Sequence, residues 1–525
     1  MAVKGKIILK KYKWTSFKSV HVAGFIWVND QYLSGKSFAE FIKGKSSSFD
    51  DFKLIAKVIN GQFSVIVENE EEIWAVSGHT WSYPVFYCRS NDEVIISDDP
   101  EGLLKQIPNP KPDNFSRNYF LLFGVTPGAK TLVEQISQIQ PGEILVLKSS
   151  EKKSISIFNE YGKTSFQKVS ENELYQLILS VFEKYYNYLK DKHILLPLTS
   201  GYDSRLLACL LKKFGHEKVL CAMWGRKNNS EKEAAEKLAK QLGFKFEFID
   251  YSKEVASGFT SQPDFYDYIH FAGHLSSMPY LQDYFAVKAL KIKQLIGEET
   301  IVLPGHPGDF LRGSHLDTGM ETAIDSYLVS KIIDKFSSSV PLNLKLLNEV
   351  ENFIVKHFLY DPDLKPWQKF EKWDFQDRQC KFISNSNQVY LFSGQQVMMP
   401  LFDKQFLEFF SRVPLKQKLG ANYYFSTLEN KFFLPYGVNF NLRSKVQHDQ
   451  DHAYLKKLIL KISPRFVKNI YYPLNDNIYY REITNELRIS NRSFKYKYPR
   501  KPHFYNSYII QWYLQLIEEI YLHGN

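Results

Sequence analysis

Strands and helices alternate between residues 193 and 251, and this alternation constrains the fold more than any other feature of the sequence. HILLPLT, EKVLCAMW and KFEFIDY are short apolar runs that predict buried strands. Between them, SRLLACLLKKFG and SEKEAAEKLAKQLG have apolar residues at helical spacing. A helix between each pair of strands is typical of βαβ units, so this region predicts a parallel sheet covered by helices.

The chain before this region follows a different pattern. Short apolar or alternating runs are separated by polar turns, namely GQFSVIVEN, EIWAVSG, YPVFYC, EVIISDD and QPGEILVLKSS. Such runs predict a mostly antiparallel β domain, to which SFAEFIKG and DDFKLIAKVI add helices. Residues 150–170 are polar and patternless, which suits a linker, and beyond residue 320 the pattern is mostly helical. We therefore expect one domain over residues 1–160 and a second over residues 161–525.

Length and composition agree with this division. A chain of 525 residues exceeds one ordinary core, and 44% hydrophobic with 16% aromatic residues is ample for packed domains. The net charge of +10 is compatible with an anionic partner such as a nucleotide phosphate, but it is modest for this length. Nucleic acid is not the expected partner. The basic and aromatic segment 492–505 lacks a surrounding OB or RRM pattern, so we interpret it as surface or as a docking segment.

Cysteine usage and the length of apolar runs bear on the compartment. Cys88, Cys209, Cys221 and Cys380 are far apart and form no CxxC pair. This pattern argues against a structural zinc site or a disulfide framework and fits a reducing environment. MAVKGKIILKKYKW lacks the apolar run of a secretory signal, and no run of about 18 apolar residues predicts a membrane span. We expect a cytoplasmic protein.

The turn after the first predicted parallel strand carries the strongest functional signal. LLPLTSGYDSRLLA passes from a buried strand through small residues into a helix. Thr199, Ser200, Gly201 and Ser204 are small enough for a pyrophosphate to approach the backbone N–H groups of that helix. Asp203 would repel phosphate unless a cation such as Mg²⁺ lies between them. The alternative that this stretch alone leaves open is an ordinary strand–helix turn capped by Asp or Ser.

A second stretch strengthens this interpretation. TIVLPGHPGDFLRGSH, at 300–315, again runs from an apolar strand into a glycine-rich turn with one carboxylate, Asp309. Two such turns at neighbouring strand ends would place Asp203 and Asp309 around one cation. Neither turn is a Walker A loop, and the GKS triplets at 35–37 and 44–46 lack the required first glycine.

These motifs together resemble the asparagine synthetase family of N-type ATP pyrophosphatases. LTSGYDS is similar to the family's SGGxDS pyrophosphate loop, and GHPGDFLRG falls where the family has its second glycine–aspartate motif. MPLFDKQFLEFFSRVPLKQKLG, at 399–420, resembles the Pro-Phe-Leu-Asp stretch, and GQFSVIVEN and YPVFYC resemble the N-terminal glutaminase domain. The likeness implies a degenerate Ntn-hydrolase-like α+β domain. An α/β adenine-nucleotide alpha-hydrolase-like (ATP pyrophosphatase) domain with a helical C-terminal part would follow it.

The resemblance implies ATP-dependent amide-bond formation through an acyl-adenylate, with ATP and Mg²⁺ as cofactors. A small-molecule or peptide carboxylate would attack the α-phosphorus, and an amine donor would then displace AMP. The residues implied to bind ATP or pyrophosphate are Leu198, Thr199, Ser200, Gly201, Asp203, Ser204, Met223 and Gly305. Asp203 and Asp309 are the implied metal ligands, and Asp309 and Lys445 are the implied catalytic residues. Without the resemblance, Lys445 is an ordinary solvated lysine.

The first departure from the family pattern concerns the nitrogen source. Ala2 follows Met1 where the glutaminase members carry a nucleophilic cysteine, so we do not expect glutamine hydrolysis. The nitrogen would then come from free ammonia, from a partner, or from an amine of the substrate. A homo-oligomer or a partner protein is compatible with this expectation.

Three further departures fall in the predicted site. Ser200 replaces a glycine, which would cost about 1 kcal/mol if that position needs φ > 0. His306 and Phe310 stand where the second motif often has acidic residues. The segment 396–398, Gln-Val-Met, replaces the family's Glu-x-Arg. Aspartate is therefore not the expected substrate.

Several functions stay open within this framework. KFISNSNQVYLFSGQQVMMPLFD is most similar to the surface-polysaccharide branch of the family, in which a sugar uronic acid would be amidated. An intramolecular ring-closing synthetase of the β-lactam or lasso-peptide type is a second possibility. A catalytically inactive binding module of the same fold is a third.

Overall fold

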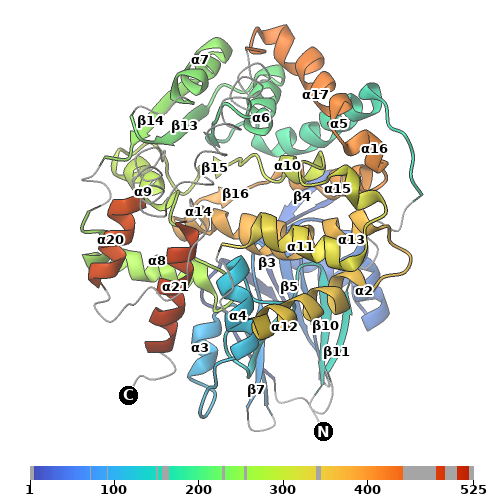
Figure 1. Ribbon diagram of the computed structural model, residues 1–525, viewed down its shortest axis with the longest axis vertical. Helices are drawn as coiled ribbons and strands as arrows, with labels where there is room; N and C mark the ends of the chain where they lie inside the picture. Colours follow the sequence, from blue (N-terminus) through green and yellow to red (C-terminus); the bar gives the residue numbers. More distant parts are fainter. Residues whose placement is uncertain are drawn as a thin grey trace.

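The computed structural model describes residues 5–70, 72–90, 93–148, 152–156, 165–227, 231–252, 257–338, 344–440, 480–490 and 505–519. The chain is a mixed α/β protein (Figure 1). The mostly antiparallel sheets of the N-terminal part occupy the lower half of the view, and a parallel sheet flanked by helices lies above them. None of the helices in the described ranges is long and apolar enough to cross a membrane.

Two sheets form the N-terminal part. The larger has the order β11-β10-β6-β5-β3-β2, with β4 beside β3, and all its pairs are antiparallel. Its strands are β2 (Trp14–Phe17), β3 (Val20–Val28), β4 (Gln31–Ser34), β5 (Asn60–Glu68), β6 (Glu72–Ser77), β10 (Glu143–Lys148) and β11 (Lys152–Ser156). The smaller sheet has the order β1-β8-β7-β9, built from β1 (Gly5–Ile8), β8 (Glu93–Ser97), β7 (Phe86–Ser90) and β9 (Ile136–Gln138). Of the described strands in these two sheets, only β1 and β8 pair in parallel. The mostly antiparallel β region that the sequence predicts is present.

One detail of the sequence prediction is wrong. Residues 152–156 are not linker but form the edge strand β11, which pairs antiparallel with β10. The register sets Ile155 opposite Ile144. The larger sheet therefore continues by one short edge strand after β10.

Side chains of the two sheets meet in a common core. Ile66, Ala75, Tyr87, Ile96 and Leu145 belong to this cluster. On the outer face of the larger sheet, α1 (Gly35–Lys45) and α2 (Phe49–Val58) bury their apolar faces. On the outer face of the smaller sheet lie α3 (Pro100–Leu104) and α4 (Asn114–Phe123). The N-terminal part is therefore a helix–sheet–sheet–helix stack.

The parallel sheet has the order β14-β13-β12-β15-β16, and every pair in it is parallel. Its strands are β12 (Ile194–Pro197), β13 (Val219–Gly225), β14 (Lys245–Asp250), β15 (Ile301–Val302) and β16 (Gln396–Val397). The helices α6 (Tyr202–Lys213) and α7 (Lys232–Leu242) make the first two crossovers. The chain first moves outward from β12 to β14 and then returns to β15 on the other side of β12. The strand order reverses at this point, which is where open parallel sheets bind ligands.

Further helices in the described ranges flank this sheet or pack on the N-terminal part. They are α5 (Glu171–Leu189), α8 (Pro263–Gly273), α9 (Tyr284–Ile292), α10 (Gly308–Leu311), α11 (Asp325–Phe336), α12 (Leu344–Ile354), α13 (Pro366–Trp373), α14 (Gln388–Phe392), α15 (Lys404–Ser411), α16 (Leu415–Lys418), α17 (Asn422–Leu428), α20 (Tyr480–Ser490) and α21 (Asn506–Ile517). The closing helix α21 buries Ile509, Trp512 and Tyr513 and packs against α4, which α11 and α12 also contact. The predicted helical character beyond residue 320 is confirmed.

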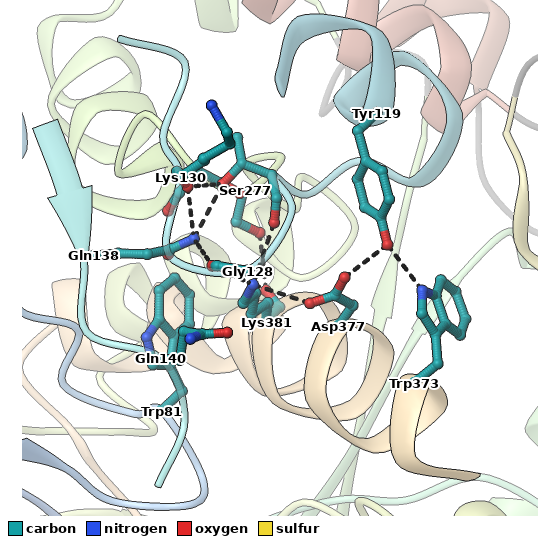
Figure 2. Close-up of polar contacts among 12 residues, drawn as sticks. Trp81, Tyr119, Gly128, Lys130, Gln138, Gln140, Ser277, Trp373, Asp377 and Lys381 are labelled. Atoms are coloured by element: carbon teal, nitrogen blue, oxygen red, sulfur yellow. Dashed lines mark hydrogen bonds and ion pairs between the residues drawn. The ribbon is translucent and has the colours of Figure 1, made fainter. Parts of the chain in front are cut away.

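A buried polar helix joins the two parts of the chain. It is the π-helix Asp374–Ile383, which directly continues α13. Asp377 accepts a hydrogen bond from Tyr119 of α4 at 2.7 Å and pairs with Lys381 at 2.9 Å (Figure 2). Lys381 also donates to the carbonyl oxygen of Gly128 at 2.9 Å. Since buried charges are tolerated only when they are paired, this network fixes the helix against α4 and the loop that follows α4.

A buried ion pair makes a second connection. Lys184 of α5 lies 2.7 Å from Asp403, and the two side chains are 3% and 0% exposed. Asn60, the first residue of β5, donates to the same carboxylate at 2.9 Å. The hydrophobic core is likewise continuous across residue 160, with Phe25 and Ile517 in one cluster. The division into two domains at that residue stays a prediction.

The Lys184–Asp403 pair yields a stability prediction. The substitution Lys184→Met should lower the free energy of unfolding by about 3–5 kcal/mol, because it leaves a buried carboxylate without its cation. The decrease can be measured by urea denaturation followed by tryptophan fluorescence.

Lys331→Met is the matched control, because Lys331 pairs with Asp317 at 2.9 Å on the surface, where the side chains are 39% and 38% exposed. Its loss should stay below about 1 kcal/mol. If both substitutions cost the same, the buried pair does not hold the two parts together.

Candidate functional site

The two turns singled out in the sequence lie at the point where the strand order reverses. One follows β12 and leads into α6, and the other follows β15 and leads into α10. Because β12 and β15 are parallel neighbours, both turns lie at the same edge of the sheet. The helix α6 begins after Gly201, and no side chain caps its first backbone N–H groups. These groups are therefore available to an anion.

Hydroxyl groups hold the first turn in shape. The backbone N–H of Thr199 donates to Ser204 Oγ at 3.2 Å, and the N–H of Gly201 donates to Thr199 Oγ1 at 3.1 Å. Thr199 is exposed, Ser200, Gly201 and Asp203 are partly buried, and Ser204 is buried. The backbone of Ser200 does not adopt positive φ, and Gly201 has φ −66°. The strain expected from a serine at this position is therefore absent.

Arg205 supports the backbone of the first turn, a role that no pattern in the sequence indicated. Its buried guanidinium donates to the carbonyl oxygen of Ser200 at 2.9 Å and to that of Val438 at 2.7 Å. The guanidinium also stacks on the rings of Phe433 and Phe440, at 5.3 and 5.1 Å from their centres. The rings come from a distant segment of the chain, so only the folded structure reveals the contact.

Glycines bring the second turn into contact with the first. A methyl group on Gly308 would lie 2.1 Å from Asp203 Cγ, and one on Gly305 would lie 3.1 Å from the backbone nitrogen of Ser204. No side chain fits at Gly308 while Asp203 keeps its position. The backbone N–H of Asp309 also hydrogen-bonds the Asp203 carboxylate. The structure thus places Asp203, Asp309, Gly305 and Ser204 together.

Asp203 is electrostatically strained. Burial, followed by the nearby charge of Asp309, raises its pKa to about 7, although hydrogen bonds and Arg312 act in the opposite direction. One of these hydrogen bonds comes from Tyr424 Oη of α17, at 2.9 Å. Asp309 itself is 66% exposed and paired with Arg312. Tyr424 and Arg312 are site residues that sequence reasoning missed. Tyr424 lies in no motif, and Arg312 lies within GHPGDFLRG, where only Asp309 and the glycines suggested a role.

The two carboxylates fit a magnesium ion that is shared with phosphate oxygens. No group of three or more His, Cys, Asp or Glu side chains in the described ranges is placed to hold a metal. Magnesium in phosphate-transfer sites is commonly bound by one or two carboxylates together with substrate phosphates. A cation next to Asp203 and Asp309 would also relieve the repulsion that raises the pKa of Asp203. The donor set is therefore sufficient for Mg²⁺ with a bound nucleotide.

His306 and Phe310 stand where the family motif often has acidic residues, and neither adds a charge to the second turn. Burial lowers the pKa of His306 to about 4, so its imidazole is neutral at physiological pH and adds no positive charge toward a phosphate. Phe310 is 2% exposed and packs against Phe375, with ring centres 5.6 Å apart. Phe310 therefore fills the core beneath the turn.

The remaining predicted residues are placed as follows. Leu198 is buried, and its N–H donates to the carbonyl oxygen of Ala222 at 2.8 Å, so only its carbonyl group is left for a ligand. Met223 is buried within β13. Lys445 lies outside the described residues. Gln396, in the position of the missing Glu-x-Arg, bonds Tyr32 and Tyr188 at 2.8 and 3.0 Å.

A further buried carboxylate, that of Asp283 near the end of β13, was not predicted from the sequence. Asp283 occupies the N-cap position of α9 but makes no capping bond. It accepts hydrogen bonds from Trp224 Nε1 at 3.0 Å and from Tyr390 Oη at 3.3 Å. Burial raises its pKa to about 7, and no described residue forms an ion pair with it. In the sequence, an Asp before an apolar helix predicts only a cap.

No protein-family model and no curated protein matches the sequence. Solved structures similar to parts of the chain include NMN synthetase from Francisella tularensis, with 18% identity over 28% of this chain and 59% of that chain. NH3-dependent NAD synthetase from Campylobacter jejuni is 15% identical over 38% and 92% of the two chains. Glutamine PRPP amidotransferase from B. subtilis is 13% identical over 57% and 58%. The TM-scores of 0.20, 0.21 and 0.18 are too low to support any argument about this chain.

The raised pKa of Asp203 predicts a pH dependence of stability in metal-free buffer with EDTA. Its folded pKa of about 7 exceeds the ordinary value of 3.8, so the folded state binds the proton more tightly. The resulting stability is full below the ordinary value and is lost as the pH rises through about 7. Between about pH 5 and pH 8, Asp203→Asn should therefore gain about 1–2 kcal/mol relative to the wild type. Urea denaturation at each pH measures this difference, and a pH-independent difference would contradict it.

Proposed function

We propose that this chain is an ATP-dependent ligase that forms an amide bond through an acyl-adenylate. The observation that carries the proposal is the contact between the two turns at the reversal of strand order. There, Asp203 and Asp309 lie beside the uncapped start of α6. A carboxylate pair next to free backbone N–H groups is suited to a polyphosphate with its cation. The resemblance of LTSGYDS to a pyrophosphate loop supports the same assignment.

The residues of the turns have separate roles in this scheme. The N–H groups at the start of α6 and the hydroxyl groups of Thr199 and Ser204 bind the β- and γ-phosphates. Gly305 and Gly308 keep the second turn free of side chains, so that nothing separates Asp309 from Asp203. The hydrogen bond from Tyr424 orients the Asp203 carboxylate. The α-phosphorus is then held at the mouth of the turn, where the substrate carboxylate reaches it.

Mg²⁺, held by Asp203 and Asp309, would supply positive charge that stabilises the pyrophosphate leaving group. Arg312 pairs with Asp309 in the absence of a nucleotide and is proposed to contact the same phosphates. Lys445 keeps its proposed role as a cation near the acyl centre. Met223, on the neighbouring strand β13, is proposed to lie against the adenine.

The acyl substrate that we propose first is a sugar uronic acid, and the amine is ammonia or an amine that the substrate itself carries. The support is the likeness of residues 381–403 to the surface-polysaccharide branch. In the structure, Gln396 bonds two tyrosines instead of forming the ion pair of an aspartate-specific site. A ring-closing reaction would use the same activated carboxylate, with the amine on the same molecule.

Calorimetric titration of Mg²⁺–ATP tests the nucleotide site. The wild type should bind with an affinity that Asp203→Asn lowers at least about tenfold, because the substitution removes half of the carboxylate pair. Asp317→Asn is the matched control, since Asp317 follows the second turn but pairs with Lys331 on the surface. Binding should be followed by AMP release when a uronate and ammonia are supplied. A folded wild type that binds no Mg²⁺–ATP would favour the inactive binding module.

Gly308→Ala tests the contact between the turns. The new methyl group would overlap the Asp203 carboxylate, so Asp203 must move and Mg²⁺–ATP affinity should fall at least about tenfold. Gly44→Ala is the control, because Gly44 lies in α1 with open space around it. It should leave binding unchanged and add up to about 1 kcal/mol of helix stability. Equal binding by both variants, measured by calorimetry, would show that the site does not need the contact.

A further inference from the structure

Arg378 differs in its polar contacts from Asp374, Asp377 and Lys381, the other charged residues of the π-helix Asp374–Ile383. Asp374 bonds His315 Nδ1 at 2.5 Å, and Asp377 pairs with Lys381 at 2.9 Å. The guanidinium of Arg378, by contrast, has no hydrogen bond or ion pair with any residue in the described ranges. Its contacts are with rings, 4.2 Å from the centre of Phe382 and 5.6 Å from that of Phe336.

The guanidinium is partly desolvated but still reachable. Arg378 is partly buried, and desolvation lowers its pKa, yet none of its nitrogen atoms is fully enclosed. A guanidinium has five N–H donors, and those that no described residue accepts are open to a ligand from solvent. The stacking on two phenylalanines holds the group in place without satisfying these donors. An arginine in this state is poised for an anionic ligand.

A second cation contacts one of the same rings. Lys335, at the end of α11, lies against the same Phe336 ring, 6.0 Å from its centre. Its ammonium donates to the carbonyl oxygen of Ser314 at 3.4 Å and has no carboxylate within ion-pair distance among the described residues. Burial lowers the pKa of Lys335, and the charges of Asp374 and Asp309 act in the opposite direction.

These residues adjoin the second turn of the nucleotide site. The segment that carries Asp309 continues through Ser314 to His315, so it touches Lys335 at the first position and Asp374 at the second. The charge of Asp309 reaches Lys335, and the charge of Asp374 reaches both Lys335 and Arg378. Arg378 is therefore linked, through Asp374 and His315, to the segment that follows Asp309, where the proposed activation of a carboxylate occurs.

We propose that Arg378, assisted by Lys335, binds a second anionic group of the acyl substrate, a carboxylate or a phosphate that ATP does not activate. A guanidinium binds either group through paired hydrogen bonds, and the ammonium adds charge without fixed geometry. The identification of the ligand as the acyl substrate rests on the proposed function. The existence of an anion site at Arg378 does not.

The test compares anions by calorimetry at constant ionic strength. Succinate and inorganic phosphate are the dianionic probes, and acetate is the monoanionic one. The wild type should bind at least one dianion in preference to acetate, and Arg378→Gln should weaken that binding at least about tenfold. Arg117→Gln is the matched control, because Arg117 already pairs with Glu518, and it should bind like the wild type. Preference for succinate would identify a carboxylate, and preference for phosphate a phosphate ester.

Two outcomes of this titration would overturn the proposal. One is a wild type that does not distinguish the dianions from acetate. The other is an Arg378→Gln variant that binds the preferred dianion as well as the wild type does.

Thermal unfolding of Arg378→Met separates binding from structure. Removal of an unpaired, desolvated cation should leave Tm unchanged or raise it, whereas a clear fall in Tm would assign Arg378 to structural support and overturn the proposal. A titration of Arg378→Gln with Mg²⁺–ATP tests whether Arg378 belongs to the nucleotide site. Unchanged ATP binding is expected, and its loss would place Arg378 in the nucleotide site instead. If the wild type binds a dianion but no ATP, the anion site stands and the proposed ligase function fails.

Discussion

The return of the chain from β14 to β15, beside β12, is the constraint on which the rest of the structure depends. This return places the ends of β12 and β15 next to each other, although the two strands are far apart in the sequence. Because strands in a parallel sheet end at one edge, both turns are then forced into contact. The close approach of Gly308 to Asp203 follows from this arrangement and leaves no room for a side chain. The candidate site is thus a product of sheet topology.

The contact between the two turns also keeps the carboxylates of Asp203 and Asp309 close to each other, which lowers stability. Asp203 has a pKa of about 7 because it is buried near Asp309, and such strain is typical of groups that await a ligand. Asp283 and Arg378 each have no ion-pair partner among the residues that the structure describes. Elsewhere, the buried charges of Lys184, Lys381 and Lys418 are matched by carboxylates. These paired charges support the fold.

The helix that begins at Asp374 contacts both the N-terminal part and the segment that follows Asp309. On one side its charges bind α4 and the loop that follows α4, through Tyr119 and Gly128 (Figure 2). On another side it holds His315 and therefore the segment that follows Asp309. Irregular helices of this type often occur at functional sites, because the wider turn redirects side chains. The N-terminal part thereby contributes to the position of the second turn.

The sequence by itself determined the local elements and the composition of the turns. Helical and strand periodicities predicted the parallel strands at 193–251 and the antiparallel strands before them, because burial of an apolar face imposes these periods. Small residues followed by Asp203 and Asp309 marked the turns for the same local reason. The tertiary structure alone decided the relations across long separations. Arg205 supports the first turn, Tyr424 donates to Asp203, and Arg378 forms no ion pair with a described residue. These relations have no periodic signature, since they arise from the order of the strands and from the packing of helices whose own sequences specify only an apolar face.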